Sequence, residues 1–229
     1  MRLWTILLAV ALAAACRAEP RREAMVQEQI EARGITNATV LAAMRKVPRE
    51  EFVPTAMRAL AFRDGPLPIG RGQTISQPYI VALMSELLEL KRGGKVLEVG
   101  TGSGYQAAVL AEIEAEVYSV EIVEWLATSA EERLKRLGYG KVKVKCGDGY
   151  VGWKEHAPFD GVMVTCAVEP VPPPLIEQLK AGGRLVVPLG EAGDTQMLAV
   201  LTKDAKGNVS RRDVAPVLFV PLVREEKKR

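Results

Sequence analysis

The sequence is poor in the residues that enzymes most often use for nucleophilic and metal chemistry. Its 229 residues include one histidine, His156, and three cysteines, Cys16, Cys146 and Cys166. A single histidine excludes sites built on several histidine ligands, and its polar surroundings are typical of a solvated side chain. The cysteines have no C-x-x-C spacing and are too few for a disulfide framework. The chain is therefore expected to work without a metal and without a Ser-His pair.

A strong charge of one sign is also missing. The 31 Lys and Arg residues against 28 Asp and Glu leave a net charge of +3, so bulk charge gives no support for nucleic-acid binding. Apolar residues make up 48% of the chain, with 20 Gly and 14 Pro. This composition is that of an ordinary globular protein, and the length predicts one domain.

The N-terminus has the pattern of a signal peptide. Arg2 precedes an apolar run over residues 3–15, which ends in three alanines directly before Cys16. The run is well short of the ~20 residues that a transmembrane helix needs, so no transmembrane domain is predicted. Cys16 also resembles a lipoprotein processing site, and the alternative is an upstream extension of a protein that starts at Met25. We therefore assign residues 1–24 to a leader and residues 224–229 to a charged tail.

The remaining chain predicts an α/β fold. Residues 25–44 have a helical pattern with a break at Gly34, residues 64–78 are rich in Gly and Pro and predict a loop, and Pro78 opens a helix. From residue 95 onward strands and helices alternate, which predicts a doubly wound, mostly parallel sheet. Expected strands cover residues 96–99, 116–120, 142–146, 159–165, 184–188, 197–202 and 214–223, and expected helices cover 104–114, 123–137 and 173–180.

A glycine-rich turn follows the first of these strands. Gly100, Gly102 and Gly104 lie where a strand runs into a helix, which lets a ligand approach the backbone. The dinucleotide fingerprint G-x-G-x-x-G is not met, because Tyr105 stands where its third glycine belongs. Glu98, just before the turn, would repel a pyrophosphate and attract an ammonium group. A tight turn without a ligand is the alternative.

Two more acids end the next two strands. Glu121 lies about 20 residues past the turn, where doubly wound folds place an acid that binds ribose hydroxyls. Asp148 could accept a hydrogen bond from the amine of adenine. As alternatives, Glu121 caps the next helix and Asp148 shapes a turn. The three acids would thus bind, one after another, an ammonium group, a ribose and an adenine. S-adenosylmethionine carries these three groups and fits the acids better than NAD does.

The loop before Pro78 is a second candidate. Ser76 or Gln77 could simply cap the helix that Pro78 opens, and without a histidine nearby in sequence Ser76 is a poor candidate for an activated nucleophile. The pattern of the loop by itself does not choose its chemistry.

Together these two motifs resemble the protein-L-isoaspartate O-methyltransferase family. The resemblance rests on residues 73–78 and 97–105, is supported at 47–53, 147–149, 158–160, 179–183 and 219–223, and extends over residues 25–223. It implies a single S-adenosylmethionine-dependent methyltransferase domain with a seven-stranded sheet. Residues 25–92 would form a helical cap and active-site loop, and residues 93–223 a Rossmann-like core.

The resemblance also implies an activity and a set of site residues. A methyl group would pass from S-adenosylmethionine to the α-carboxylate of L-isoaspartyl residues in damaged proteins and peptides, and the ester would close to a succinimide that hydrolyses partly to normal aspartate. Ser76 matches the catalytic serine, and we expect Thr74 and Ile75 to help position the acceptor. The expected cofactor-binding residues are Glu98, Gly100, Thr101, Gly102, Gly104, Glu121 and Asp148.

Location and assembly are two further expectations. The supply of S-adenosylmethionine favours the cytoplasm, while a functional leader would instead direct the chain to the periplasm or anchor it through a lipid on Cys16. A monomer is expected.

The chain also departs from the family pattern. Cys166 and Glu169 stand where small residues followed directly by proline are expected, on the substrate side of the predicted site. In a sheet of strand order 3-2-1-4-5, two strands separate Cys146 from Cys166, so no disulfide joins them. Two other functions stay open: a nicotinamide-dependent oxidoreductase, and a catalytically silent envelope protein that recognises peptide carboxylates.

Overall fold

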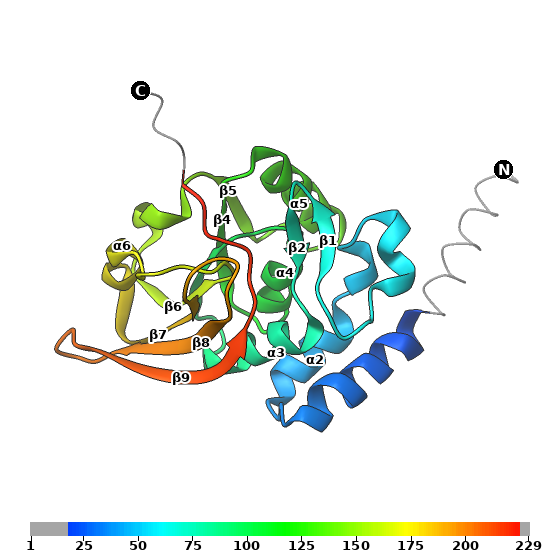
Figure 1. Cartoon of the computed structure of the whole chain (residues 1–229), viewed down its shortest axis with the longest axis horizontal. Coiled ribbons are helices and arrows are strands. Elements are labelled where there is room, and N and C mark those ends of the chain that lie inside the picture. The colour runs from blue at the N-terminus through cyan, green and yellow to red at the C-terminus, as the bar shows by residue number, and fades with distance from the viewer. Residues whose placement is uncertain (1–17, 225–229) are drawn as a thin grey trace, which may run out of the picture.

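A computed structural model describes residues 18–224 of the chain (Figure 1). The predicted signal peptide, the lipid anchor at Cys16 and residues 225–229 of the charged tail lie outside the described residues. Within residues 18–224, no helix has both the length and the apolar character required to cross a membrane.

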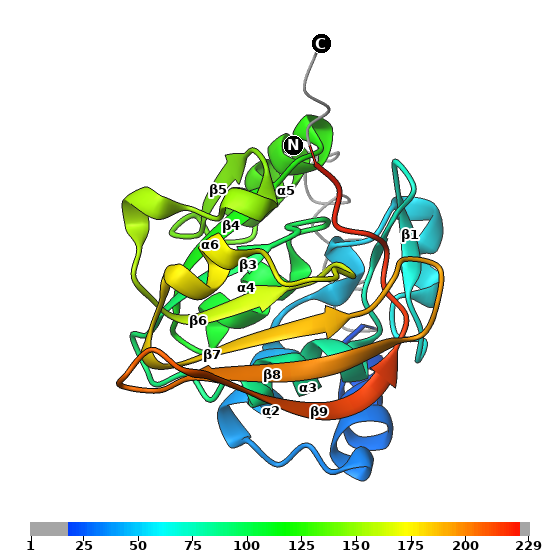
Figure 2. The ribbon, with the colours of Figure 1, turned by 60° about the vertical axis from the view of Figure 1, so that its left-hand side comes forward.

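A seven-stranded sheet organises the fold, with strand order β5-β4-β3-β6-β7-β8-β9 (Figures 1 and 2). β5, β4, β3, β6 and β7 are parallel, and β8 and β9 are antiparallel to their neighbours. The predicted fold class and the 3-2-1-4-5 order are thus confirmed. The strands are β3 Lys95–Val99, β4 Glu116–Glu121, β5 Lys143–Cys146, β6 Phe159–Val164, β7 Leu179–Leu189, β8 Gln196–Lys203 and β9 Val209–Val217.

Both faces of the sheet are covered, because successive side chains of a strand point to opposite faces. In β3, Val96 packs into one hydrophobic cluster while Leu97 and Val99 pack into another. The first cluster contains side chains of α3, α4 and α5, and the second contains side chains of α6. These helices are α3 Pro78–Leu87, α4 Tyr105–Glu112, α5 Glu124–Arg136 and α6 Pro173–Glu177.

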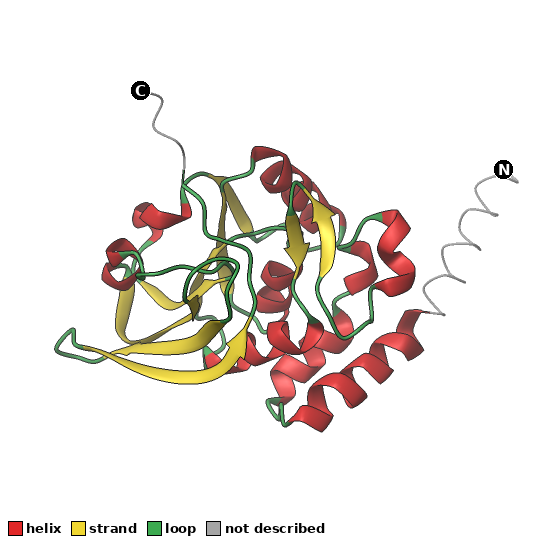
Figure 3. Cartoon of the chain, viewed as in Figure 1, coloured by secondary structure: helices red, strands yellow, loops and turns green. Residues whose placement is uncertain are grey.

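An N-terminal helical layer packs against α3 and α4 (Figure 3). Residues 18–25 are α-helical and continue as a π-helical turn Val26–Ile30 and a 3-10 turn Glu31–Arg33. Gly34 then adopts a left-handed conformation with φ of 92° and ends this segment. α2 Ala38–Lys46 begins with the side chain of Asn37 accepting hydrogen bonds from the next backbone N–H groups. Short 3-10 turns follow at Arg49–Glu51 and Thr55–Leu60.

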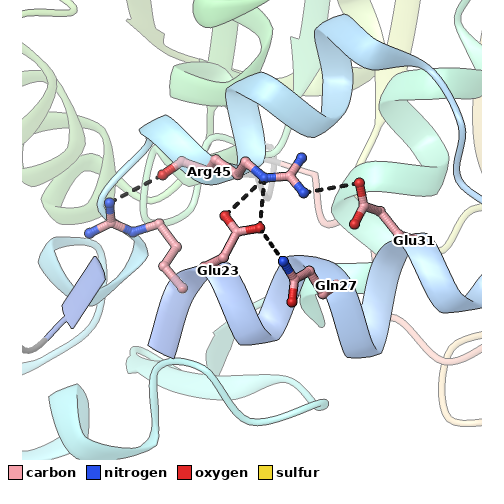
Figure 4. Close-up of polar contacts among 5 residues, drawn as sticks. Glu23, Gln27, Glu31 and Arg45 are labelled. Atoms are coloured by element: carbon pink, nitrogen blue, oxygen red, sulfur yellow. Dashed lines mark hydrogen bonds and ion pairs between the residues drawn. The ribbon is translucent and has the colours of Figure 1, made fainter. Parts of the chain in front are cut away.

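The first helix begins before Met25, where the sequence had placed its start. Arg22 is buried and its Nη2 lies 2.6 Å from Glu50 Oε1. Glu23 and Glu31 both pair with Arg45 of α2, at 2.9 Å each (Figure 4). Residues 18–24, which the sequence analysis gave to the leader, therefore pack on the folded protein.

Two other segments differ from the sequence prediction. The expected loop 64–78 contains an antiparallel hairpin, β1 Leu67–Gly70 with β2 Gln73–Ile75. The expected strand 214–223 is displaced, because β9 starts at Val209, directly after a turn whose backbone the side chain of Asp204 holds. Residues 218–223 leave the sheet and run between its carboxyl edge and the β1–β2 hairpin (Figure 2).

Candidate active site

A cavity lies at the carboxyl ends of β3 and β4, beside the point where the strand order reverses between β3 and β6. This is the place where open α/β sheets bind their ligands. Gly100, Gly102 and Glu121 line the cavity together with Gly149 and residues 220–223. The structure thus brings the glycine turn and the acid of the second strand together, as the sequence predicted.

The glycine turn has backbone conformations that favour glycine. Gly100 and Gly102 have φ values of 98° and 53°. A Cβ atom on Gly100 would collide with Thr165 Oγ1 and lie 2.8 Å from Cys166 Sγ, so position 100 has no room for a side chain. Gly104 starts α4 with a φ of 85°. The cradle is therefore made of bare backbone, which fits the close approach of a ligand.

Glu121 holds the glycine turn and faces the cavity. Its Oε2 accepts a hydrogen bond from Gly102 N at 2.8 Å, and its Oε1 accepts one from Val123 N at 3.0 Å. A carboxylate has about four acceptor positions, so two further hydrogen bonds from ligand hydroxyls are within its capacity. The N-cap of α5 is Val123, without a side-chain capping hydrogen bond, so Glu121 does not cap this helix, and its contact with a ribose stays a prediction.

Glu98 lies beneath the glycine turn and not on the cavity wall. It is fully buried and accepts a short hydrogen bond from Ser119 Oγ, which itself lies 2.5 Å from Thr101 Oγ1. The pKa of Glu98 is raised to about 8, mainly by burial and in smaller part by the charge of Glu121, while the Ser119 hydrogen bond opposes the shift. The pleat of β3 points Glu98 toward the α4 side of the sheet. Glu98 and the buried Thr101 thus support the turn from below, and their predicted contacts with a cofactor stay predictions.

Asp148 shapes a turn next to the cavity. Its Oδ1 accepts a hydrogen bond from Tyr150 N at 2.8 Å and caps the 3-10 turn Gly149–Val151. Gly149 lines the cavity directly, and a Cβ there would lie 2.5 Å from Val99 Cγ1. The turn-shaping alternative is therefore present in the structure, and a contact of Asp148 with adenine stays a prediction.

A second cavity of about 430 Å³ adjoins the first. Ser76 and Gln77 line it on one side and residues 216–220 on the other. Thr74, Thr165 and Val220 belong to the walls of both cavities, so the two spaces meet there. Among residues 18–224, no Lys, Arg, Asp or Glu side chain lines this second cavity.

The three residues predicted to act on the acceptor have different surroundings. Ser76 and Thr74 face the second cavity, whereas Ile75 is 3% exposed, packs in the core and lines neither cavity. The sequence predicts that Ile75 helps to position the acceptor, but alternation along β2 turns its side chain into the core. The helix-cap alternative for Ser76 and Gln77 is also wrong, because the N-cap of α3 is Gln77 and its side chain makes no capping hydrogen bond.

Sequence reasoning missed two parts of the site. Thr165 donates a hydrogen bond from Oγ1 to Gly100 O at 2.7 Å and lines both cavities. Residues 218–223 cross the carboxyl edge of the sheet, held by hydrogen bonds between Ala167 N and Val220 O and between Leu222 N and Ala167 O. The resemblance at residues 219–223 was the one sequence signal for this segment.

Cys146, the last residue of β5, and Cys166, two residues after β6, are not joined to each other. β4 and β3 lie between the two strands, so Cys146 and Cys166 form no disulfide with each other, as predicted. Cys166 lines the first cavity, but burial raises the pKa of its thiol to about 12. A protonated thiol is a poor nucleophile, which assigns Cys166 a packing role beside the glycine turn.

The order of the strands, the glycine turn and Glu121 at the end of the second strand of the core together define an S-adenosylmethionine-dependent methyltransferase fold. The chain belongs to the protein-L-isoaspartate(D-aspartate) O-methyltransferase family, whose family model matches residues 20–227. It is therefore a methyltransferase enzyme, as the sequence predicted.

Named relatives agree with this assignment. A protein-L-isoaspartate O-methyltransferase of Opitutus terrae is 58% identical over 205 residues, covering 90% of this chain and 88% of that protein. One from Gloeobacter violaceus is 57% identical over 202 residues, covering 88% of this chain and 98% of its own.

Solved structures show the same relationship. A protein-L-isoaspartate O-methyltransferase structure superimposes with a TM-score of 0.79 and 31% identity, covering 87% of this chain and 65% of its own. A Plasmodium falciparum structure described as a member of the same enzyme class, in complex with S-adenosyl-L-homocysteine, has a TM-score of 0.75 and 26% identity and covers 89% and 99% of the two chains.

Proposed function

We propose that this chain repairs damaged proteins by transferring a methyl group from S-adenosylmethionine to the α-carboxylate of L-isoaspartyl residues. The observation that carries the proposal is the pair of cavities that meet at Thr74, Thr165 and Val220. A donor in the first cavity and an acceptor in the second would face each other at this junction. The relatives named above support the acceptor, and the S-adenosyl-L-homocysteine complex of the Plasmodium falciparum protein supports the donor.

The residues of the first cavity fit the cofactor. S-adenosylmethionine supplies an electrophilic methyl group on its sulfonium. The bare backbone at Gly100 and Gly102 would hold its amino-acid part, and Glu121 would accept hydrogen bonds from the ribose hydroxyls. The loop at Asp148 and Gly149 would border the adenine.

The second cavity needs to position its acceptor and does not need to activate it. A carboxylate is already ionised near neutral pH, so no strong general base is required. Ser76 and Thr74 can donate hydroxyl hydrogen bonds that hold the carboxylate in line with the methyl group. Orientation and exclusion of water then supply most of the acceleration. The single histidine of the chain is consistent with this chemistry.

The test is methyl transfer from labelled S-adenosylmethionine to an isoaspartyl peptide, with the matching aspartyl peptide as the control. The assay uses the full chain, because residues 18–24 pack on the fold. Base-labile label on the isoaspartyl peptide alone is the expected result. Measurable cofactor binding with no label on either peptide would contradict the proposal and favour a silent binding role.

We further propose that the chain acts as a monomer in the cytoplasm, where the cofactor is made. Both cavities are lined by residues of one chain, so a monomer has a complete site. Sedimentation of the purified protein checks the monomer, and cell fractionation checks the compartment. Recovery of the protein in the envelope fraction, with a lipid on Cys16, would contradict the cytoplasmic location.

A further inference from the structure

Arg49 is a fully buried arginine that lies between Ser76 and Tyr105, the residue that follows the glycine turn. It is 0% exposed and follows Pro48 at the start of a 3-10 turn. Its Nη2 donates a hydrogen bond to Ser76 O at 2.7 Å, and its Nε donates one to Ala61 O at 2.8 Å. Its guanidinium also lies over the ring of Tyr105, 4.8 Å from the centroid. Arg49 therefore contacts both the backbone of Ser76 and the first residue of α4.

The electrostatic setting of Arg49 is unusual for a buried cation. Among the described residues, its polar partners are backbone carbonyls and a tyrosine ring, and its Nη1 has no hydrogen-bond partner. Burial lowers the pKa of Arg49, and Tyr105 opposes this shift, but an arginine keeps its charge in proteins. A buried cation without a carboxylate partner is costly, so stability alone is a weak reason for its presence.

The second cavity, in which we place the acceptor, suggests a functional reason for burying Arg49. The acceptor of the proposed reaction is an anion, yet no charged side chain among residues 18–224 lines this cavity. Arg49 places a positive charge directly behind the Ser76 carbonyl, at 2.7 Å from that oxygen. Low-dielectric surroundings strengthen the field of such a charge at the cavity wall. The same hydrogen bond fixes the backbone that carries the Ser76 hydroxyl.

We propose that Arg49 is a positioning residue that sets the orientation of Ser76 and supplies the positive field for the anionic acceptor. This inference rests on the proposed methyl transfer to a carboxylate. It assigns a role in acceptor use and none in cofactor binding, because the contact with Tyr105 lies on the core side of α4, away from the wall of the first cavity.

The test compares Arg49→Met with Arg184→Met in the full chain. Arg184 is the control, because it too donates to a backbone carbonyl, Leu87 O at 3.2 Å, at the end of α3 far from Ser76. Unlike Arg49, it is partly exposed and pairs with Glu89 at 2.6 Å. We measure kcat and KM with an isoaspartyl peptide, the Kd of S-adenosyl-L-homocysteine by calorimetry, and Tm. Wild-type turnover is measured first, so that failure of the proposed reaction is seen separately from failure of this inference.

For Arg49→Met we expect kcat/KM for the peptide to fall about ten- to a hundredfold, the effect of losing one charged hydrogen bond. The Kd of S-adenosyl-L-homocysteine should stay within about twofold of wild type. Arg49→Lys keeps the charge but has fewer donors, so it should restore part of the lost kcat/KM. Arg184→Met should match wild type in both measurements.

Two results would overturn the inference. One is wild-type kcat/KM in Arg49→Met, and the other is a parallel loss of peptide turnover and S-adenosyl-L-homocysteine binding, which marks a purely structural role. If Arg49→Met does not fold, Arg49→Lys decides: lowered kcat/KM with unchanged S-adenosyl-L-homocysteine binding supports the inference, and unchanged kcat/KM refutes it.

Discussion

The helix before Met25 gives the most direct test of how the fold is held together. A chain that starts at Met25 loses the ion pair between Arg22 and Glu50, which are 2.6 Å apart with side-chain exposures of 11% and 16%. Breaking a buried pair by removing one partner costs about 3–5 kcal/mol, because the other charge stays buried. The pair between Glu23 and Arg45 is more exposed, at 41% and 33%, and adds under about 1 kcal/mol.

These energies predict a measurable change in thermal stability. For a protein of this size, 1 kcal/mol lowers Tm by about 2–4 °C, so the loss of the Arg22 pair corresponds to about 6–20 °C. Differential scanning calorimetry of chains that start at Ala18 and at Met25 measures the difference.

A substitution at the partner separates the ion pair from other effects of the truncation. Glu50→Gln should destabilise the chain from Ala18 by several kcal/mol and the chain from Met25 by much less, because the partner of Glu50 is already gone. Melting temperatures within about 2 °C of each other for the two unsubstituted chains would refute the reasoning.

Three further predictions concern the site itself. Ser76→Ala should lower kcat/KM for an isoaspartyl peptide about ten- to a hundredfold with unchanged S-adenosyl-L-homocysteine binding; full turnover would remove Ser76 from acceptor positioning. Gly100→Ala should abolish S-adenosyl-L-homocysteine binding in calorimetry, because its φ of 98° and the 2.8 Å approach to Cys166 Sγ leave no space for a Cβ; a Kd within about twofold of wild type would contradict the bare-backbone cradle. Glu98→Gln should flatten the pH dependence of unfolding: the folded-state pKa of Glu98 is raised from 4.5 to about 8, so wild-type stability falls as pH rises through this window. The expected slope is about 1.4 kcal/mol per pH unit, measured by denaturant unfolding, and equal slopes in both proteins would argue against a buried protonated Glu98.

The sequence determined the parts of this protein that depend on local pattern. Alternating strands and helices after residue 95 specified the parallel sheet and its order, because short apolar strands joined by amphipathic helices pack in few ways. The glycine turn and Glu121 were identifiable for the same reason, since each is placed by its own strand end. The family resemblance at residues 73–78 added the acceptor loop, which no spacing argument could interpret.

Tertiary structure decided the parts that depend on contacts between distant segments. The pleat of β3 buries Glu98 beneath the glycine turn, at which the sequence predicts that it contacts a ligand. The pairing of β2 with β1 turns Ile75 into the core. Residues 218–223 cross the site because β9 starts earlier than its apolar pattern indicates. Arg49 contacts Ser76 across 27 residues of sequence, a link that only packing creates. Local pattern thus fixed the sheet and its turns, while the shape of the acceptor cavity and its electrostatic support arose when separate segments were packed together.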